Sequence, residues 1–385
     1  MKLGIYIQVP FCQTKCTYCN FHTGVFSRSL YSPYAAAVCA EIVRHRELYA
    51  AEGIQAIPGP SVDTIYVGGG TPSLLEPAAL ARMLDAIRST FDCALEETTL
   101  EADPETIAPE KAAAWVAAGF NRISLGAQSF SDAELAAAGR MHRREDVFAA
   151  NRFLRALGFR NISMDLIAGL PHQTQTSWDA NVAQILELRP EHISIYLMEI
   201  DEGSRLGREV LSGGPRYSAA ALPDDDSMAA FYERACARLA STGYVHYEIS
   251  NWALPGFESR HNLKYWRRDP YFGFGAGAHS FSGTQRWANT HDPAAYAAAI
   301  EQRRSPVEQL ETVSREQALE EELFLGLRQL QGIDLARVES QYNSNLRPRI
   351  EELRAQGLVE FDGTRLRLAP DRLTVSNEVF VTLLD

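Results

Sequence analysis

The sequence of 385 residues predicts an α/β fold in which six parallel strands form a partial barrel. Short runs of apolar and β-branched residues alternate with longer helical stretches, which indicates repeated strand–helix–strand units. Six units are too few for a complete eight-fold barrel. Glycines or polar residues follow several of the runs, and ligands bind at the carboxyl ends of barrel strands. We therefore expect the functional site at that end of the sheet.

The predicted strands and helices alternate from the first residues to about residue 200. The strand segments are apolar or β-branched, as in VDTIYV, whereas several helical segments are rich in alanine, as in PEKAAAWVAAG. The strands are expected at 3–9, 62–67, 97–102, 121–127, 161–167 and 192–198. The helices between them are expected at 33–51, 77–91, 109–119, 145–157 and 175–188.

The chain changes character after residue 200. A segment with loop-forming residues precedes a helix expected at 225–242. From about residue 307, two helical patterns are followed by GLVEFDGTRLRLAP, a hairpin with Asp-Gly at its turn. These patterns predict a small α+β, winged-helix-like appendage. We divide the chain into a core barrel at 1–230, a segment that completes the barrel at 231–306, and the appendage at 307–385.

Composition argues against a membrane-spanning, a secreted or a broadly nucleic-acid-binding protein. No apolar run is long enough to cross a bilayer, and the start, MKLGIYIQVPF, is typical of a strand rather than a signal peptide. We therefore expect a cytoplasmic protein with reduced thiols. A formal charge of -12 argues against broad nucleic-acid binding, which needs a basic face. A local basic patch or a solvated helix start both remain open for Arg140, His142, Arg143 and Arg144.

Three of the six cysteines stand together in CQTKCTYC, directly after the first predicted strand. Cys12, Cys16 and Cys19 therefore lie on the first strand–helix loop. Thiolates suit soft metals, and because a cluster of four irons normally takes four of them, three would leave one iron open. A zinc site completed by His22 is the alternative. The remaining cysteines are expected to be apolar fillers: Cys39, Cys93 and Cys236.

Residues that suit ligand contact also follow later strands. YVGGGTPS ends the second strand, and its glycines let the backbone approach a ligand and expose amides to it. Charged and amide side chains at successive strand ends indicate ligand contacts, because strand interiors rarely hold them. A cap or a local salt bridge also explains each of them singly. The candidates are Gly69, Gly70, Thr71, Glu101, Gln128 and Asp165.

The cysteine spacing, with Tyr18 before the third cysteine, resembles the signature of the radical S-adenosylmethionine superfamily. This resemblance implies a partial barrel and a 4Fe-4S cluster whose open iron is chelated by S-adenosylmethionine. From Tyr6 nearly to the C-terminus, the chain is also similar to the coproporphyrinogen dehydrogenase branch. That similarity implies that Tyr6, Gly69 and Glu101 serve the cluster-bound S-adenosylmethionine. The positions that contact a second molecule in the dehydrogenase correspond to Gly70, Thr71, Gln128, Arg140 and Asp165.

Departures from the dehydrogenase make the chain look like the HemW family of haem chaperones. The dehydrogenase has a fourth cysteine where Phe21 stands, and a long N-terminal extension where eleven residues precede Cys12. The HNLKYW stretch at 261–266 matches the His-Asn-x-x-Tyr-Trp motif of the HemW family, and 363–380 resembles that family's ending. Gln8 stands where relatives usually carry histidine, and we expect it to tune the cluster rather than abolish it.

His261 of this motif is the candidate axial ligand for haem iron. Histidine is a common haem ligand, and Tyr265 and Trp266 offer flat apolar surface for a porphyrin. The alternative is that the aromatic pair packs in the core and His261 is a hydrogen-bonded loop residue. His279 is a haem-ligand candidate as strong as His261, and His22 and His246 are weaker candidates. Arginines that could pair with propionates are Arg260, Arg267 and Arg268.

The first functional hypothesis is a haem carrier rather than an enzyme. The resemblance implies delivery of haem to apo-haemoproteins such as membrane respiratory enzymes, with peripheral membrane contact and a homodimer supported by the cluster. The alternative is an oxygen-independent coproporphyrinogen III dehydrogenase, which decarboxylates propionates to form protoporphyrinogen IX. A radical methyltransferase of the same branch is a third. Phe21 and the short N-terminal segment favour the carrier.

Overall fold

The computed structural model describes residues 2–55, 57 and 59–384, and its centre is one curved sheet of 12 strands. Their order is β12-β11-β10-β9-β1-β2-β3-β4-β5-β6-β8-β7. The strands from β9 to β6 run parallel, and those outside them pair antiparallel. The strands are β1 (Lys2–Val9), β2 (Ser61–Gly69), β3 (Asp92–Ala102), β4 (Arg122–Gln128), β5 (Ile162–Ala168), β6 (His192–Leu197), β7 (Val245–Glu248), β8 (Asn251–Ala253), β9 (Tyr271–Phe274), β10 (His279–Phe281), β11 (Gln285–Asn289) and β12 (Val307–Thr312).

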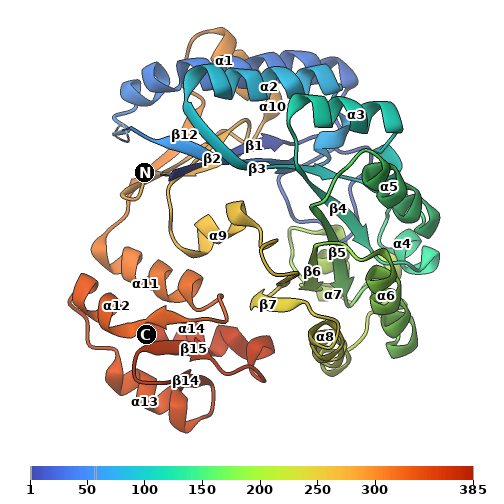
Figure 1. Ribbon diagram of the computed structural model, residues 1–385, viewed down its shortest axis with the longest axis vertical. Coiled ribbons are helices and arrows are strands. Elements are labelled where there is room, and N and C mark those ends of the chain that lie inside the picture. The colour runs from blue at the N-terminus through green and yellow to red at the C-terminus, as the bar shows by residue number, and fades with distance from the viewer. Residues whose placement is uncertain (1, 56, 58, 385) are drawn as a thin grey trace.

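Helices cover the outer face of the curved sheet (Figure 1). The predicted alternation of strands and helices over the first 200 residues, and with it the partial α/β barrel, is confirmed. Short 3-10 turns at Arg28–Leu30, Pro72–Leu74 and Pro104–Thr106 lie in the loops at the carboxyl ends of the first three strands. The helices of this part are α1 (Tyr31–Ala51), α2 (Pro77–Thr90), α3 (Pro109–Ala118), α4 (Asp132–Ala137), α5 (Arg144–Ala156), α6 (Gln175–Leu188), α7 (Arg205–Leu211), α8 (Asp225–Ala240) and α10 (Pro293–Glu301).

The prediction of six strands was too low, because the sheet extends beyond both of its predicted edges. Next to β1, strand β9 adds a further parallel strand, with Gly4–Ile7 paired to Tyr271–Phe274. The strands that sequence reasoning missed have three to six residues each. Runs this short carry little periodicity, so only the sheet edge beside them identifies them as strands.

Helix α9 (Arg260–Trp266) lies inside the curve of the sheet (Figure 1). Gly4 in β1 makes this possible, because a Cβ there would stand 2.9 Å from Lys264 Cδ and 3.2 Å from His261 Cε1. The first turn is held by Glu97, whose Oε1 accepts the backbone N–H of His261 at 3.0 Å. The HNLKYW stretch therefore packs against the inner face of the sheet.

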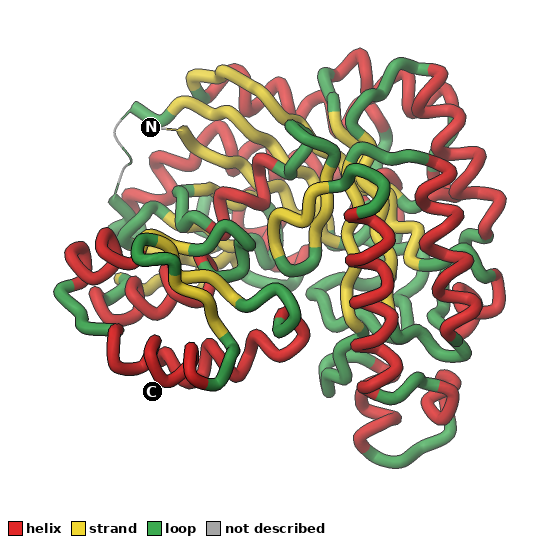
Figure 2. Tube along the Cα trace, turned by 60° about the horizontal axis from the view of Figure 1, so that its bottom comes forward, coloured by secondary structure: helices red, strands yellow, loops and turns green. Residues whose placement is uncertain are grey.

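The C-terminal part forms a small unit with its own sheet (Figure 2). The first three of its four helices and an antiparallel sheet of order β13-β15-β14 give the winged-helix arrangement that the sequence predicted, with Asp362 and Gly363 in the hairpin turn. The expectation of two helices before the hairpin was wrong, because Asn343 in the left-handed conformation separates two short helices. The elements are α11 (Arg315–Gly326), β13 (Ile333–Asp334), α12 (Leu335–Tyr342), α13 (Arg347–Ala355), β14 (Val359–Phe361), β15 (Arg365–Leu368) and α14 (Ser376–Leu384).

Among the helices in the described part of the chain, none combines the length and the apolar character needed to cross a membrane.

Candidate functional site

The three-cysteine loop begins directly after β1, at the carboxyl end of the sheet. It is closed by backbone hydrogen bonds from Cys12 N to Gly24 O at 2.8 Å and from Gly24 N to Pro10 O at 2.9 Å. Within it, Cys19 N donates to Cys16 O at 3.3 Å. All three thiols are partly exposed and free of disulfides. They are therefore presented on one loop, open to a ligand.

The pKa of the Cys12 thiol is raised to about 11, mainly by burial, and Cys19, Asp103 and Cys16 contribute in the same direction. Positive charge would be needed to stabilise the thiolate, and a bound metal supplies it. In the described part of the chain, no three His, Cys, Asp or Glu side chains are close enough to hold a single ion. A four-iron cluster places each thiolate on a different iron. The soft donor set fits such a group.

The glycine-rich end of β2 is shaped around Cys12. Gly70 N donates to Val9 O at 2.8 Å, and Thr71 N donates to Phe11 O at 2.7 Å, so the two loops lie side by side. A Cβ on Gly70 would stand 2.9 Å from Cys12 Sγ and 2.6 Å from Phe11 O. Only glycine leaves room for the thiol at this point.

Glu101, at the end of β3, joins the first strands of the barrel. Its Oε1 accepts the Tyr66 hydroxyl at 2.8 Å, and its Oε2 accepts Gly69 N at 2.9 Å. Burial raises the Glu101 pKa to about 7, although both hydrogen bonds oppose the shift. Beside it, the Tyr6 hydroxyl donates to Gln8 Oε1 at 2.7 Å, and the Gln8 amide lies over Gly69. Gln8 therefore supports the residues predicted to face S-adenosylmethionine.

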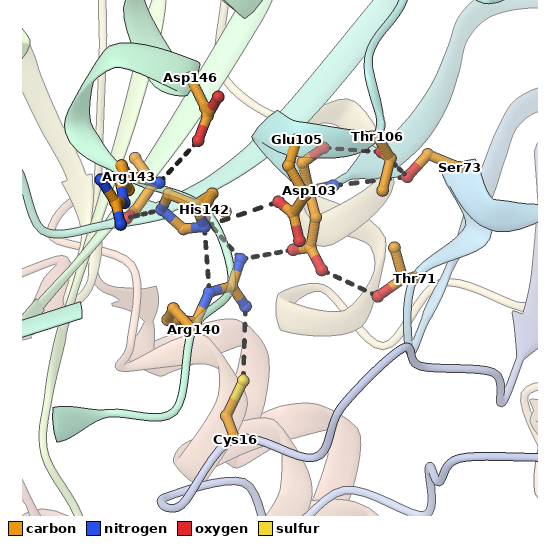
Figure 3. Close-up of polar contacts among 12 residues, drawn as sticks. Cys16, Thr71, Ser73, Asp103, Glu105, Thr106, Arg140, His142, Arg143 and Asp146 are labelled. Carbon is orange, nitrogen blue, oxygen red and sulfur yellow. Dashed lines mark hydrogen bonds and ion pairs between the residues drawn. The ribbon is translucent and has the colours of Figure 1, made fainter. Parts of the chain in front are cut away.

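Arg140 connects the cysteine loop to the strand ends (Figure 3). Its Nη1 lies 3.6 Å from Cys16 Sγ, and its Nη2 donates to Asp103 Oδ1 at 2.5 Å and to Gly126 O at 2.9 Å. The other carboxylate oxygen of Asp103 accepts the Thr71 hydroxyl at 3.0 Å. Asp103 was missed by sequence reasoning, which took only Glu101 from TLEADPE. The position of Asp103 two residues further, just past the strand end, was the available signal.

Two further predicted residues approach the same place. Gln128 ends β4 with a φ of 63°, a strained conformation for a side chain of this size. A Cβ on Gly126 would stand 3.0 Å from Gln128 Nε2 and 3.4 Å from Asp103 Oδ1, so these side chains converge. Burial raises the Asp165 pKa to about 6, and Arg140 acts on it in the opposite direction. The predicted S-adenosylmethionine residues thus gather around Arg140 and Glu101.

His261 is fully buried beside the first of these residues, with 6.4 Å between its ring centroid and that of Tyr6 and 5.3 Å to that of Tyr66. Its Nδ1 is 3.0 Å from the Thr64 hydroxyl, and its Nε2 is 2.9 Å from the Tyr265 hydroxyl. Burial lowers the His261 pKa to about 3, so the ring is neutral. Both ring nitrogens are engaged, as in the alternative interpretation of a hydrogen-bonded histidine in the core.

The arginines around the motif are also engaged. Arg260 pairs with Glu96, and Arg268 Nε lies 2.9 Å from Glu321 Oε2. Arg267 is exposed. Of these three, Arg267 is the one best placed to meet a ligand carboxylate.

Two of the other histidine candidates, His22 and His279, lie on the surface beside the cysteine loop, whereas His246 is in strand β7. His22 and His279 are exposed, and the pKa of each is lowered, first by partial burial and then by His291. The rings of His22 and His291 are 4.0 Å apart between centroids. His291 was missed because it stands in a loop without a motif. His246 is stacked on Trp252 at 4.1 Å, and its pKa is lowered to about 4 by burial.

Two family models match the chain. Residues 6–184 match the radical SAM superfamily, and residues 313–371 match the HemN C-terminal domain. Among solved structures, the radical SAM enzyme coproporphyrinogen III oxidase (HemN) from Escherichia coli aligns with a TM-score of 0.82 at 23% identity, covering 99% of this chain and 89% of that one. At this identity the likeness shows a shared fold.

Curated relatives match over almost the full length. The heme chaperone HemW of Mycobacterium tuberculosis is 37% identical, covering 99% of this chain and 94% of the relative. HemW of Bacillus subtilis is 34% identical, covering 98% of both chains. The chain therefore belongs to the HemW family within the radical SAM superfamily.

Proposed function

We propose that this protein is a haem chaperone, which binds haem and transfers it to apo-haemoproteins. The observation that carries the proposal is the near-complete alignment with proteins named heme chaperone HemW. The HNLKYW stretch at 261–266 supports it. We further propose that the protein works in the cytoplasm and reaches membrane respiratory enzymes by peripheral contact.

Membership of the superfamily implies a 4Fe-4S cluster and S-adenosylmethionine. We assign the cluster to Cys12, Cys16 and Cys19. The cluster supplies one iron that the amino and carboxylate groups of S-adenosylmethionine can chelate. Gly70 leaves space for the first thiol, and Arg140 places a cation beside the second.

The remaining residues are assigned to S-adenosylmethionine by their positions. Glu101 is held by two donors, so its carboxylate is oriented before a ligand arrives. Tyr6, Gly69 and Glu101 lie on three neighbouring strands, β1, β2 and β3. We assign a second set, which comes from the loop after β2, from β4 and β5, and from the loop before α5: Gly70, Thr71, Gln128, Arg140 and Asp165.

For haem iron we retain His261 as the motif candidate and add the exposed histidines beside the cysteine loop. His261 would have to give up its bond to Thr64 or Tyr265 to reach iron. His22 and His279 are exposed without such a change. Variants of His261, His22 and His279 to alanine, followed by the Soret absorbance of bound haem, decide between them. A ligand variant shifts this band, whereas a structural variant lowers stability without moving it.

A second candidate function is oxygen-independent coproporphyrinogen III oxidation. The fold shared with the Escherichia coli enzyme favours it. The exposed Phe21, where that branch carries a cysteine, counts against it.

One experiment separates the two functions. After anaerobic reconstitution, the protein receives hemin in one tube and coproporphyrinogen III with S-adenosylmethionine in another. Stable haem binding without protoporphyrinogen supports the chaperone, whereas protoporphyrinogen formation contradicts it. Cys236→Ser, in α8, is the control for serine variants of the three clustered cysteines. Only the clustered variants should lose iron.

The same material tests the proposed homodimer. Size-exclusion chromatography of the reconstituted and the metal-free protein should show a dimer only with the cluster. A dimer of equal amount in both samples would contradict a role of the cluster in assembly.

A further inference from the structure

A pocket of about 800 Å³ lies between the cysteine loop and the first turns of α1, α2 and α3. Its volume falls within the usual range for small-molecule sites. Cys12 lines it, but among the described residues that do so there is none of those assigned above to S-adenosylmethionine. The pocket therefore borders the cysteine loop but does not include the residues assigned to S-adenosylmethionine.

Three cations line this pocket. Arg28 and Arg82 are exposed, and Lys111 is partly buried with its Nζ 3.3 Å from Ser73 O. Across the described residues, no carboxylate lies within ion-pair distance of any of the three. Their charges are therefore available to a ligand.

Two carboxyl groups, Glu76 and Glu105, also line the pocket. Glu76 is exposed to solvent, which screens its charge. Burial raises the Glu105 pKa to about 7, which weakens its charge near neutrality. The first turns of three helices add partial positive charge. The pocket is therefore suited to an anionic ligand.

The rest of the wall is mainly apolar, although Gln13, Ser32 and Thr106 also line the pocket. Val25 is 63% exposed, and Phe26, Tyr31 and Leu74 also line the pocket. Tyr31 is fixed by stacking on Phe11, with 4.1 Å between the ring centroids. A ligand that fits both parts has a flat apolar body and carboxylates along one edge.

We propose that this pocket holds the edge of haem that carries its two propionates, with Arg28, Arg82 and Lys111 as their partners. The inference rests on the proposed function and adds a location to it. Guanidinium and ammonium groups pair with carboxylates by charge-assisted hydrogen bonds, and the apolar wall covers part of the ring. Among the described residues that line the pocket there is no histidine, so the iron ligand comes from another segment.

The test is a hemin titration of the full-length protein, followed by Soret absorbance. The variant carries Arg28→Gln, Arg82→Gln and Lys111→Gln together, and the control carries Arg46→Gln, an exposed residue further along α1. The triple variant should bind hemin about tenfold more weakly or worse, because two partly exposed carboxylates lose their partners. The control should bind as the unaltered protein does.

Hemin dimethyl ester, in which both propionates are blocked, gives the second arm. The unaltered protein should bind this ester about as weakly as the triple variant binds hemin, and the triple variant should lose little more with the ester. Equal hemin affinity of the triple variant and the control would overturn the inference and leave the chaperone function standing. Equal losses for hemin and ester would also overturn it, because packing would then be the cause. Absence of hemin binding by the unaltered protein would overturn the proposed function itself.

Discussion

Gly70, in the glycine-rich loop after β2, lies so close to the cysteine loop that there is no room for a side chain. We predict that Gly70→Ala prevents cluster assembly, because its Cβ would stand 2.9 Å from Cys12 Sγ and 2.6 Å from Phe11 O. Overpacking of this kind costs about 1–3 kcal/mol, less than the stability of an ordinary domain. The variant should fold but bind little iron after anaerobic reconstitution, measured by iron content and visible absorbance.

Gly158→Ala is the matched control for this substitution. Gly158 has a φ of 89° and no neighbouring heavy atom within 4 Å of its would-be Cβ, so alanine there meets backbone strain alone. Its iron content should equal that of the unaltered protein. Equal iron in the Gly70 and Gly158 variants would show that the cysteine loop moves freely away from β2.

Glu41 is a buried carboxylate that makes stability depend on pH. It accepts hydrogen bonds from Gly275 N at 2.9 Å, from Asn289 Nδ2 at 2.7 Å and from the Tyr296 hydroxyl. Burial nevertheless raises its pKa to about 7. Because the folded state then holds the proton more tightly than the unfolded state, this group's contribution to stability is full below about pH 4.5 and is lost as pH rises to about 7.

We predict that Glu41→Gln removes this dependence. Between pH 5 and pH 8, the free energy of unfolding of the variant should rise relative to the unaltered protein by about 3 kcal/mol. Urea unfolding at several pH values measures the difference. Glu47→Gln, exposed on the same helix, is the control: Arg44 lowers the Glu47 pKa, so any change should be small and of opposite sign. Parallel pH curves for Glu41→Gln and the unaltered protein would contradict the prediction.

Some site residues could be selected from the sequence alone, and others could not. A cysteine spacing, a triple glycine and a carboxylate at a strand end are local patterns, so Cys12, Gly70 and Glu101 could be selected from sequence. Asp103 gave a signal of the same kind, just past the end of β3, but only the fold brings Arg140 beside it. His291 could not be selected, because it stands in a loop without a motif and only the fold brings His22 beside it. Whether the motif residue His261 is accessible also depends on tertiary structure.

Helix α9 is fixed inside the sheet by a buried ion pair, with Lys264 Nζ 2.8 Å from Asp63 Oδ1 and both side chains less than 10% exposed. We predict that Lys264→Met lowers the free energy of unfolding by about 3 kcal/mol, because Asp63 would keep a buried charge without its closest partner. Urea unfolding measures the loss. Adding Asp63→Asn should restore part of it, since the unpaired charge is then removed.

Lys2→Met is the control for this helix. The Lys2 ammonium also approaches Asp63, at 3.7 Å, but its side chain is 64% exposed. Exposed pairs contribute little, so the change in stability should be hard to detect. Equal losses for Lys2→Met and Lys264→Met would contradict the idea that burial of α9 makes its ion pair important.

Elements differ in how far the sequence specifies them. Strands β1 to β6 are each followed by a helix or a long loop and are largely buried, so apolar runs and helical stretches together marked them within a few residues. Strand β3 begins earlier than expected because its first five residues alternate in exposure. The short strands β7 to β12 form only where an existing edge offers free backbone groups, which no local pattern encodes.

On the scale of the whole molecule, the winged-helix arrangement raises the question of nucleic-acid binding. In helix-turn-helix proteins the second helix of the motif enters the major groove, and here that helix is α13. Its surface combines arginines with Glu351 and Glu352, and Arg354 Nη1 lies 2.9 Å from Glu351 Oε1. Helix α14 lies against it, with Arg349 Nη1 donating to Leu383 O at 2.8 Å.

We therefore predict that the protein does not bind duplex DNA at physiological salt. Phosphate contacts require cations that are free to replace counterions, whereas this helix pairs its arginines within the protein and the whole chain carries a charge of -12. Fluorescence anisotropy with a labelled duplex at several salt concentrations measures binding. Glu351→Lys combined with Glu352→Lys is the informative variant: it should gain weak, salt-sensitive binding if charge is the obstacle. Salt-dependent binding by the unaltered protein would instead mean that α14 moves aside and that the C-terminal unit has a nucleic-acid partner.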